Sequence, residues 1–339
     1  MTVLWCLAAL LGAAVLGALG YVCCSPMPAV RLLRRGGDVP PPGPADYAAR
    51  RERVRVQRDL AYPSRWGRNT FDLYLPQTDG PAPVILWAHG GAFVAGDKAG
   101  VENWATCLAS EGFAVAAMNY QWAPEARYPA QVAQLGECYA ALETLARGGA
   151  PLDLARFAVA GDSAGAHMAA QFAALQGSAA LQQELKLPAR VAPDTLRAAL
   201  LYCGPYDVAQ MARPKSRMLR FFMSRVGWSY LGKKRWQNSA LCATTAVARY
   251  VTPRFPPCYL TDGNAHSFEG QGRALAAALK AQGVPVSTRF FPPAAGAVEH
   301  EYQFQLGEAN AAACYADTVR FLQTYLAPAQ KPLAQRAKT

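Results

Sequence analysis

A serine between glycines, Ser163 in the run Gly161-Asp162-Ser163-Ala164-Gly165, is the first candidate for chemistry in this sequence. The apolar residues before it (157–160) are typical of a strand, and the residues after it (166–175) are rich in helix formers. A strand, a glycine turn and a helix in this order predict a sharp bend that exposes the serine hydroxyl. Such a hydroxyl is suited to nucleophilic attack on an acyl carbon, although an ordinary capped glycine turn has the same pattern.

A second motif, His89-Gly90-Gly91-Ala92-Phe93, follows another strand-like run (83–86) earlier in the chain. Two adjacent glycines let the backbone approach a substrate oxygen and direct N–H groups at it. We expect the N–H groups of Gly90, Gly91 and Ala164 to form an oxyanion hole for the tetrahedral intermediate of acyl transfer. His89 is expected to shape this loop through hydrogen bonds.

Together with several shorter segments, these motifs resemble the α/β-hydrolases of the hormone-sensitive-lipase and bacterial carboxylesterase type. The resemblance extends from about residue 72 to residue 326, and its further segments are 119–125, 204–207, 255–257 and 300–304. It implies a mostly parallel central sheet with helices on both faces, esterase or lipase activity, and catalytic groups in the order Ser, acid, His.

His300 is the candidate general base among the four histidines of the chain. It follows a strand-like run (286–291) and a loop of small residues, where the resemblance implies that the base of this fold lies. A neutral imidazole there would take the serine proton and return it to the leaving group. His167 lies four residues after the serine, and we expect it to have a structural role.

The acidic partner of this histidine is where the sequence departs from the family pattern. The resemblance implies an Asp three residues after the glycine that ends the seventh strand, but His266 occupies that position. Asp262 and Glu269 are the nearest carboxylates. We favour Asp262, because it ends a strand, where the catalytic groups of open α/β sheets gather. Glu269 is the second choice, since it equally fits the start of a helix, and Asp207 is the third.

The alternation of strand-like and helix-like runs predicts an α/β fold with one large catalytic domain. The predicted strands are 71–75, 84–87, 113–118, 157–160, 198–203, 258–261 and 286–291. The expected domain organisation is an N-terminal transmembrane anchor or signal peptide (1–28), a linker and N-terminal cap segment (29–68), the α/β-hydrolase domain (69–328) with a cap insertion at about 205–250, and a tail (329–339).

Residues 3–24 contain no charged side chain and are long enough to cross a hydrocarbon core of roughly 30 Å. A cleavable signal peptide is the alternative, because residues 18–20 have the small side chains of a cleavage site. We favour an uncleaved anchor, since no Lys or Arg precedes the run. The basic residues that follow it predict a cytoplasmic catalytic domain, and secretion after signal cleavage is the alternative. The cysteines of the catalytic domain show no spacing typical of disulfides or metal sites, which is consistent with free thiols in a reducing compartment.

The formal net charge of +11 is concentrated at residues 213–235, which hold eight basic residues and no acidic one. Helical spacing predicts a cap helix with an apolar face and a basic face. The apolar face consists of Leu219, Phe222, Met223, Val226 and Tyr230, and the basic face of Arg213, Arg217 and Arg220. Such a helix would line an acyl or aryl pocket and contact anionic lipid headgroups, or would simply pack on the body. Nucleic-acid binding is not expected, because no recognition motif accompanies the charge.

The sequence therefore predicts a serine hydrolase that cleaves small carboxylic esters with Ser163, His300 and Asp262, without a metal or an organic cofactor. Three alternatives stay open. The first is an amidase or peptidase that uses the same catalytic groups. The second is a catalytically weak binding protein on a hydrolase scaffold. The third is a membrane-organising protein in which the anchor and the basic cap matter more than the pocket.

Overall fold

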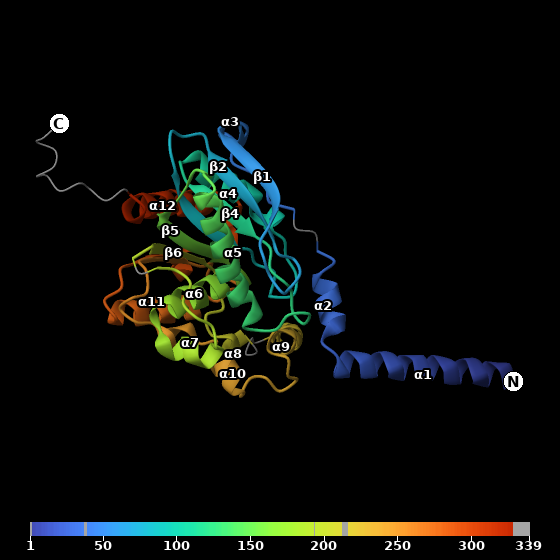
Figure 1. The fold of residues 1–339 in the computed structure, drawn as a ribbon. Helices are drawn as coiled ribbons and strands as arrows, with labels where there is room; N and C mark the ends of the chain where they lie inside the picture. Colours follow the sequence, from blue (N-terminus) through green and yellow to red (C-terminus); the bar gives the residue numbers. More distant parts are fainter. Residues whose placement is uncertain (1, 37–38, 193, 212–215, 328–339) are drawn as a thin grey trace, which may run out of the picture.

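The computed structural model describes residues 2–36, 39–192, 194–211 and 216–327. Within these residues, eight strands form one sheet in the order β1-β2-β4-β3-β5-β6-β7-β8 (Figure 1). β2 pairs antiparallel with both of its neighbours, and all other pairs are parallel. The strands are β1 (Val54–Ala61), β2 (Thr70–Pro76), β3 (Ala82–Ala88), β4 (Ala114–Met118), β5 (Leu152–Asp162), β6 (Leu196–Tyr202), β7 (Cys258–Thr261) and β8 (Val286–Arg289).

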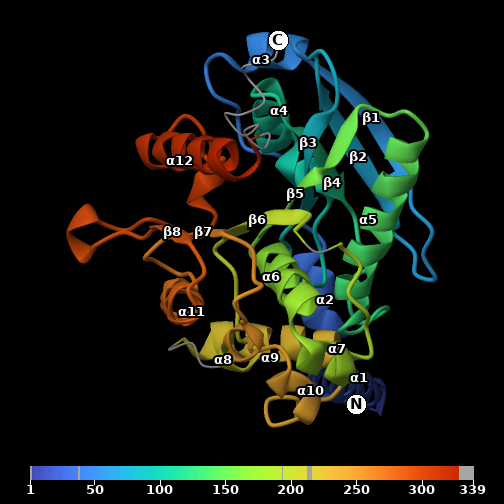
Figure 2. The same cartoon turned by 60° about the vertical axis from the view of Figure 1, so that its left-hand side comes forward.

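Helices cover both faces of this sheet (Figure 2), and each face has its own hydrophobic core. In β3, Val84 and Leu86 point into one core while Ile85 and Trp87 point into the other, as the alternation of side chains along a strand requires. The first core includes α5 (Ala130–Arg147), α6 (Ala164–Gly177) and α11 (Glu269–Ala281), and the second includes α4 (Glu102–Ser110) and α12 (Ala309–Tyr325). The predicted α/β-hydrolase fold is confirmed.

The sheet begins earlier in the chain than the sequence indicates. β1 lies inside the segment 29–68 that was expected to be a linker and N-terminal cap. β1 is an edge strand whose side chains are mostly exposed and polar, with a bulge between Gln57 and Leu60. It therefore has no continuous apolar run, which is the pattern that identifies the inner strands.

The cap lies between β6 and β7, at the place of the expected insertion. It consists of α8 (Val208–Met211), α9 (Arg217–Leu231), α10 (Ala240–Ala243) and the 3₁₀ helix η2 (Val247–Tyr250). Only the second half of α9 packs on the body, where Val226 and Tyr230 are buried. Leu219, predicted to share their face, is 41% exposed. Arg213 and the tail 329–339 lie outside the described residues.

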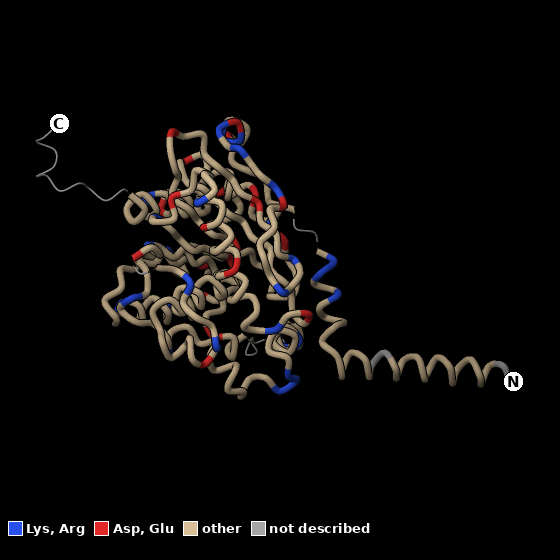
Figure 3. Tube along the Cα trace, viewed as in Figure 1, with Lys and Arg blue, Asp and Glu red and all other residues tan. Residues whose placement is uncertain are grey.

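The N-terminal helix α1 (Thr2–Cys24) is long and apolar enough to cross a membrane, a test that a signal sequence also passes. It projects from the body (Figure 1). Large apolar side chains along it are exposed, among them Leu4, Trp5 and Leu16. The next helix, α2 (Met27–Leu33), packs against α9. α2 carries one basic residue, Arg31, and Arg34 and Arg35 follow it directly, whereas α1 has no charged side chain. Figure 3 shows basic positions in this segment next to the end of α1.

Arg34, which follows α2, ties this N-terminal segment to the catalytic body. Its Nε atom donates to the carbonyl of Val94 at 2.8 Å, and its two terminal nitrogens bind the carboxylate of Glu125. Its guanidinium also lies over the ring of Trp122, 4.8 Å from the ring centre. The chain that leaves α1 is therefore anchored next to the loop that carries the His-Gly-Gly motif. The remaining helices are α3 (Tyr47–Glu52), α7 (Ala179–Leu185), η1 (Lys98–Val101), η3 (Pro293–Ala295) and η4 (Tyr302–Phe304).

Candidate active site

Ser163 lies at the turn between β5 and α6 with φ of 50° and ψ of −119°. Positive φ is uncommon for a residue with a side chain, so the turn is held by its surroundings. A Cβ atom on Gly161 would lie 2.4 Å from the backbone of Gly165, and one on Gly165 would lie 2.0 Å from the carbonyl oxygen of Ala88. The close packing of strand, turn and helix therefore requires glycine at both positions, and the local structure predicted from the sequence is present.

His300, 137 residues further along the chain, lies beside this serine. Its Nε2 atom is 2.9 Å from the Oγ atom of Ser163. The ring of Phe268 packs edge-on against the imidazole, with the ring centres 5.6 Å apart. Burial lowers the pKa of His300 to about 4, which keeps the imidazole neutral at pH 7. A neutral ring whose Nε2 carries no proton can accept the proton of the serine hydroxyl.

The other ring nitrogen of His300 contacts a hydroxyl instead of a carboxylate. Its Nδ1 atom lies 2.6 Å from the Oγ atom of Ser267. The Ser267 hydroxyl in turn donates to Oδ1 of Asp262, while the N–H of Phe268 donates to Oδ2 of Asp262 at 3.0 Å. Burial raises the pKa of Asp262 to about 7, against the effect of these hydrogen bonds. Asp262 thus contacts the histidine through Ser267, a residue that was not among the candidates from the sequence.

The other acidic candidates have different partners. Glu269 pairs with Arg273 at 2.6 Å within the first turns of α11. Asp207 accepts from the N–H of Ala209 at 3.0 Å and caps the start of the cap segment. His266, at the position of the family's acid, is 82% exposed and faces Glu299. Of the carboxylates considered from the sequence, Asp262 is the one that the structure brings to His300.

The predicted oxyanion loop requires one correction. The N–H of Gly90 donates to Oδ2 of Asp162 at 2.7 Å, so it is not free to meet a substrate oxygen. Within the part of the chain that the structure describes, the N–H groups of Gly91 and Ala92 have no acceptor. Ala164 is the first residue of α6, and its N–H has no partner within the helix. Gly91, Ala92 and Ala164 are therefore the candidate donors, in place of the set that included Gly90.

Asp162 fixes the first glycine of this loop. Besides the Gly90 N–H, it accepts the indole N–H of Trp87 at 2.7 Å through Oδ1. A Cβ atom on Gly90 would lie 2.5 Å from Oδ2 of Asp162 and 3.2 Å from the Cβ of Ser163, so only glycine permits this approach. The residue before the nucleophile therefore positions the loop, a role that its place in the sequence motif did not reveal.

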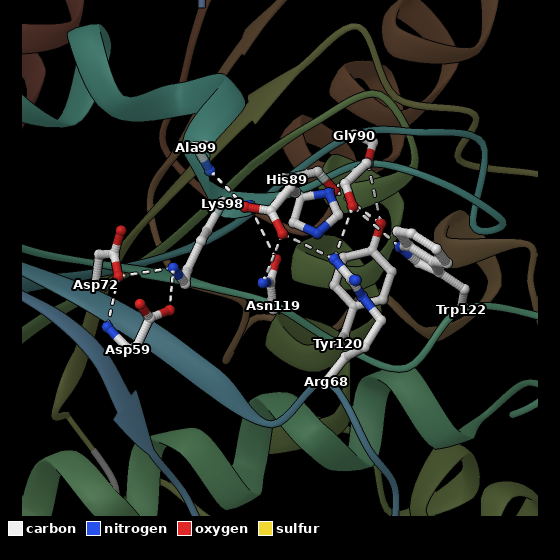
Figure 4. A network of polar contacts seen from close by, with 12 residues as sticks. Asp59, Arg68, Asp72, His89, Gly90, Lys98, Ala99, Asn119, Tyr120 and Trp122 are labelled. Atoms are coloured by element: carbon white, nitrogen blue, oxygen red, sulfur yellow. Dashed lines mark hydrogen bonds and ion pairs between the residues drawn. The ribbon is translucent and has the colours of Figure 1, made fainter. Parts of the chain in front are cut away.

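A buried polar network holds the loop from the other side (Figure 4). The hydroxyl of Tyr120 donates to the carbonyl of His89 at 2.9 Å, and Nδ1 of His89 lies 2.6 Å from the carbonyl oxygen of Gly90. Asp97 accepts from Asn119 at 2.8 Å and pairs with Arg68 at 2.9 Å. The expected role of His89 in shaping the loop agrees with these contacts. The cap contributes as well, because Tyr230 of α9 stacks on the ring of Phe93 with ring centres 3.9 Å apart.

Glu301 is a second acidic residue at the site that the sequence analysis did not select. Its Oε1 atom is 3.8 Å from Nε2 of His300. It also hydrogen-bonds to Asp162, and burial together with this neighbouring carboxyl raises the pKa of Asp162 well above its usual value. Asp162 is buried and Glu301 is partly exposed, and two carboxyls in contact favour a state in which they share a proton. Glu301 directly follows the candidate base in the chain, and this position by itself gave no reason to select it among the acidic residues.

A cavity of about 360 Å³ opens between the oxyanion loop and the His300 loop. Its lining includes Gly90, Gly91, His300 and Glu301, and Pro41 of the N-terminal segment covers part of it. The N-terminal segment and the catalytic loops thus share one wall of the cleft.

Cys203, Asp262 and His300 place their donor atoms within 4.8 Å of one another, a spacing that metal ligands also show. Here Asp262 and His300 are already engaged with Ser267 and Ser163. Burial raises the pKa of the Cys203 thiol well above its usual value, which opposes the thiolate that a metal requires. Hydrogen bonding accounts for this group of side chains.

Several known proteins resemble this chain. Esterase LipI of Mycobacterium tuberculosis is 37% identical over 123 residues, covering 34% of this chain and 37% of LipI. Esterase LipQ of the same organism is 27% identical over 233 residues, covering 66% of this chain and 53% of LipQ. The chain thus spans about a third to a half of these relatives.

Among solved structures, esterase B from Lactobacillus Rhamnosis superposes with a TM-score of 0.70 at 23% identity, covering 83% of this chain and 91% of that protein. This likeness shows the fold. The BD-FAE family model matches residues 71–271, a region that contains the oxyanion loop, the serine elbow and Asp262. With that match over more than half of its length, the chain belongs to the BD-FAE family of α/β-hydrolases.

Proposed function

We propose that this protein is a serine hydrolase that cleaves carboxylic esters through an acyl-enzyme intermediate. The observation that carries the proposal is the 2.9 Å contact between Ser163 Oγ and His300 Nε2 at a turn with positive φ, beside a loop with unpaired N–H groups. The related proteins that are named esterases favour an ester as the substrate over an amide.

Acylation begins when the Oγ atom of Ser163 attacks the carbonyl carbon of the ester. His300 Nε2 takes the hydroxyl proton as the bond forms, and the carbonyl π electrons move onto oxygen. The N–H groups of Gly91, Ala92 and Ala164 would receive this oxyanion, each donor being worth roughly 3 kcal/mol of the barrier. When the intermediate collapses, the alkoxide leaves with the proton held by His300.

Deacylation repeats the same steps with water as the nucleophile. His300 takes a proton from water, the hydroxide attacks the acyl carbon of Ser163, and the same N–H groups hold the oxyanion. Collapse releases the carboxylic acid and returns the proton to Ser163. The imidazolium that forms in both halves of the reaction needs a negative charge nearby, and we assign this role to Asp262 because Glu269 pairs with Arg273 instead.

The first test is labelling with a fluorophosphonate, which reacts quickly only with an activated serine. We expect labelling of the wild type and none of Ser163→Ala. Hydrolysis of p-nitrophenyl esters of increasing chain length should then fall about a thousandfold or more in Asp262→Asn and less than threefold in Glu269→Gln. An unlabelled wild type would favour a non-catalytic binding protein, and faster turnover of anilides than of esters would favour an amidase.

For the membrane, we propose that α1 is retained as an anchor and that the catalytic domain lies on the cytoplasmic side, because the basic residues follow the span. We also propose that α9 contacts anionic lipid. Its exposed N-terminal half combines Met218, 72% exposed, and Phe221, 39% exposed, with Arg217 and Arg220. Since α9 packs against α2, this half lies close to the end of the anchor.

The lipid contact is tested with the full-length protein in nanodiscs of neutral lipid or of lipid that is about one-third anionic. We expect ester hydrolysis to depend on anionic lipid in the wild type and to lose that dependence in Arg217→Ser/Arg220→Ser. Lys280→Ser, an exposed cation on α11, is the matched control. Equal activity in both lipids for all variants would exclude a role of α9 at the membrane surface.

A further inference from the structure

The side chain between Asp262 and His300 is the least expected feature of the catalytic centre. In the family pattern, the acid lies three residues after the strand-ending glycine, but here that position is His266, which has a φ of 50° and faces solvent. The carboxylate belongs instead to the last residue before the glycine. The hydroxyl of Ser267 lies between this carboxylate and the imidazole and contacts both.

The direction of the hydrogen bonds through this hydroxyl follows from its chemistry. A serine hydroxyl has one proton to donate, and here the proton goes to Oδ1 of Asp262. Its Oγ atom therefore acts as an acceptor toward Nδ1 of His300, 2.6 Å away, so that Nδ1 must carry a proton. In a neutral imidazole, the other nitrogen is then unprotonated. This is the nitrogen that faces Ser163 Oγ at 2.9 Å, and it is the tautomer that a general base requires.

The turn that carries Ser267 is fixed at both of its sides. The second carboxylate oxygen of Asp262 accepts the N–H of Phe268 at 3.0 Å, so a single carboxylate holds two consecutive residues. The ring of Phe268 then packs edge-on against the imidazole of His300. The hydroxyl and the aromatic ring thus approach the histidine from one short segment, and they restrict both its tautomer and its orientation.

From this arrangement we infer that Ser267 is a positioning residue of the reaction. Its hydroxyl links the carboxylate of Asp262 to the imidazole of His300, so that Asp262, Ser267, His300 and Ser163 form one chain of hydrogen-bonded side chains. The inference rests on the proposed ester hydrolysis. Ser267 lies at Nδ1 of His300, whereas the nucleophile lies at Nε2, so Ser267 acts through the histidine and not on the substrate. Its role is to accept from Nδ1 of His300 and to donate to Asp262, which keeps Nε2 free for the proton of Ser163.

The test compares Ser267→Ala, Ser267→Thr, Asp262→Asn and the double variant Asp262→Asn/Ser267→Ala in the full-length protein. We expect Ser267→Ala to lower kcat about 100- to 1000-fold with KM changed less than threefold, because binding is not affected. Ser267→Thr, which keeps the hydroxyl, should recover at least tenfold of that loss. The double variant should be no slower than the slower single variant, since the two residues act in one chain.

A second readout does not depend on turnover. With ¹⁵N-labelled histidine, the chemical shifts of the ring nitrogens report the tautomer, and the four histidines of the chain make assignment practical. We expect the Nδ1-protonated form of His300 in the wild type and in Ser267→Thr, and a mixture of tautomers in Ser267→Ala. His266→Ala is the matched control from the same turn, because its side chain faces solvent, and it should change neither readout.

The inference would be overturned if Ser267→Ala kept kcat within threefold of the wild type with an unchanged tautomer, or if its effect and that of Asp262→Asn multiplied in the double variant. Should Ser267→Ala fail to fold, the folded Ser267→Thr variant decides the matter, since a kcat as low as that of Asp262→Asn in a variant that keeps the hydroxyl would leave no role for this group. Failure of the proposed function has a different signature, namely ester hydrolysis that persists in Ser163→Ala.

Discussion

Oδ2 of Asp162 accepts the backbone N–H of Gly90 at 2.7 Å, which joins the residue before the nucleophile to the first glycine of the oxyanion loop. The two residues belong to different strand ends, since Gly90 follows β3 and Asp162 ends β5, and these strands are parallel neighbours in the sheet. The hydrogen bond therefore sets the position of the oxyanion donors relative to the Ser163 hydroxyl.

This relationship predicts that Asp162→Asn lowers kcat by about 10- to 100-fold. Asn has one acceptor oxygen for the two N–H donors of Gly90 and Trp87, and one lost buried hydrogen bond costs about 1–3 kcal/mol. Steady-state kinetics with a p-nitrophenyl ester measures the effect. Trp87→Phe leaves the hydrogen bond of Gly90 in place. This variant should lower the melting temperature while its kcat stays close to that of the wild type. An Asn variant with wild-type kcat would mean that the loop holds its shape without Asp162.

The oxyanion loop is expected to tolerate a change at Ala92 but not at Gly91. Gly91 has a φ of 111°, and a Cβ atom there would lie 2.2 Å from the carbonyl oxygen of Ala95, so Gly91→Ala must displace the loop. We expect kcat to fall at least 100-fold, which is the loss that follows when one oxyanion-hole donor is removed from other hydrolases. Ala92→Gly relieves a φ of 52° and should stay within threefold of the wild type. Normal kcat in Gly91→Ala would exclude this donor set.

The pH dependence of kcat/KM should report the ionisation of Asp262. Burial raises the pKa of this carboxyl to about 7, and only the ionised form stabilises the imidazolium of His300. Activity is therefore expected to rise with pH through about 7, while His300, with a pKa lowered to about 4, stays neutral over that range. Asp262→Asn should lose this step, and Glu269→Gln should keep the wild-type midpoint. A step that persists in Asp262→Asn would assign it to another group.

Lys98 is expected to contribute to stability rather than to chemistry. Its ammonium lies 2.8 Å from carboxylate oxygens of both Asp59 and Asp72, and its side chain is 8% exposed (Figure 4). Lys98→Met leaves the buried Asp72 with less compensation, so the free energy of unfolding should fall by about 3 kcal/mol in urea titrations. Lys280→Met, at an exposed position, should change it by less than about 0.5 kcal/mol. A small effect at Lys98 would indicate that Arg58 compensates Asp72 by itself.

Much of the fold follows from local patterns. The inner strands are continuous apolar runs because helices cover both of their faces, and each of the seven predicted strands overlaps an observed one. β1 was not predicted, because the side chains of this edge strand are mostly exposed and polar and its sequence resembles that of a linker. The nucleophile turn could be predicted for a related reason, because Gly161 is required by steric contact with Gly165 only four residues along the chain. Gly165 is required by the backbone of Ala88 at the end of the neighbouring strand β3, a contact that only the folded sheet shows.

What the sequence determined by itself is the local geometry around Ser163, the order of the elements and the apolar N-terminal helix, because short-range sterics and side-chain periodicity specify them. Only the tertiary structure decided that Asp162 occupies the Gly90 N–H and that Ser267 stands between Asp262 and His300. These contacts join residues from separate strand ends and loops. Their distances depend on how the sheet is assembled, and hydrogen bonds between such segments leave no periodic signal in the chain.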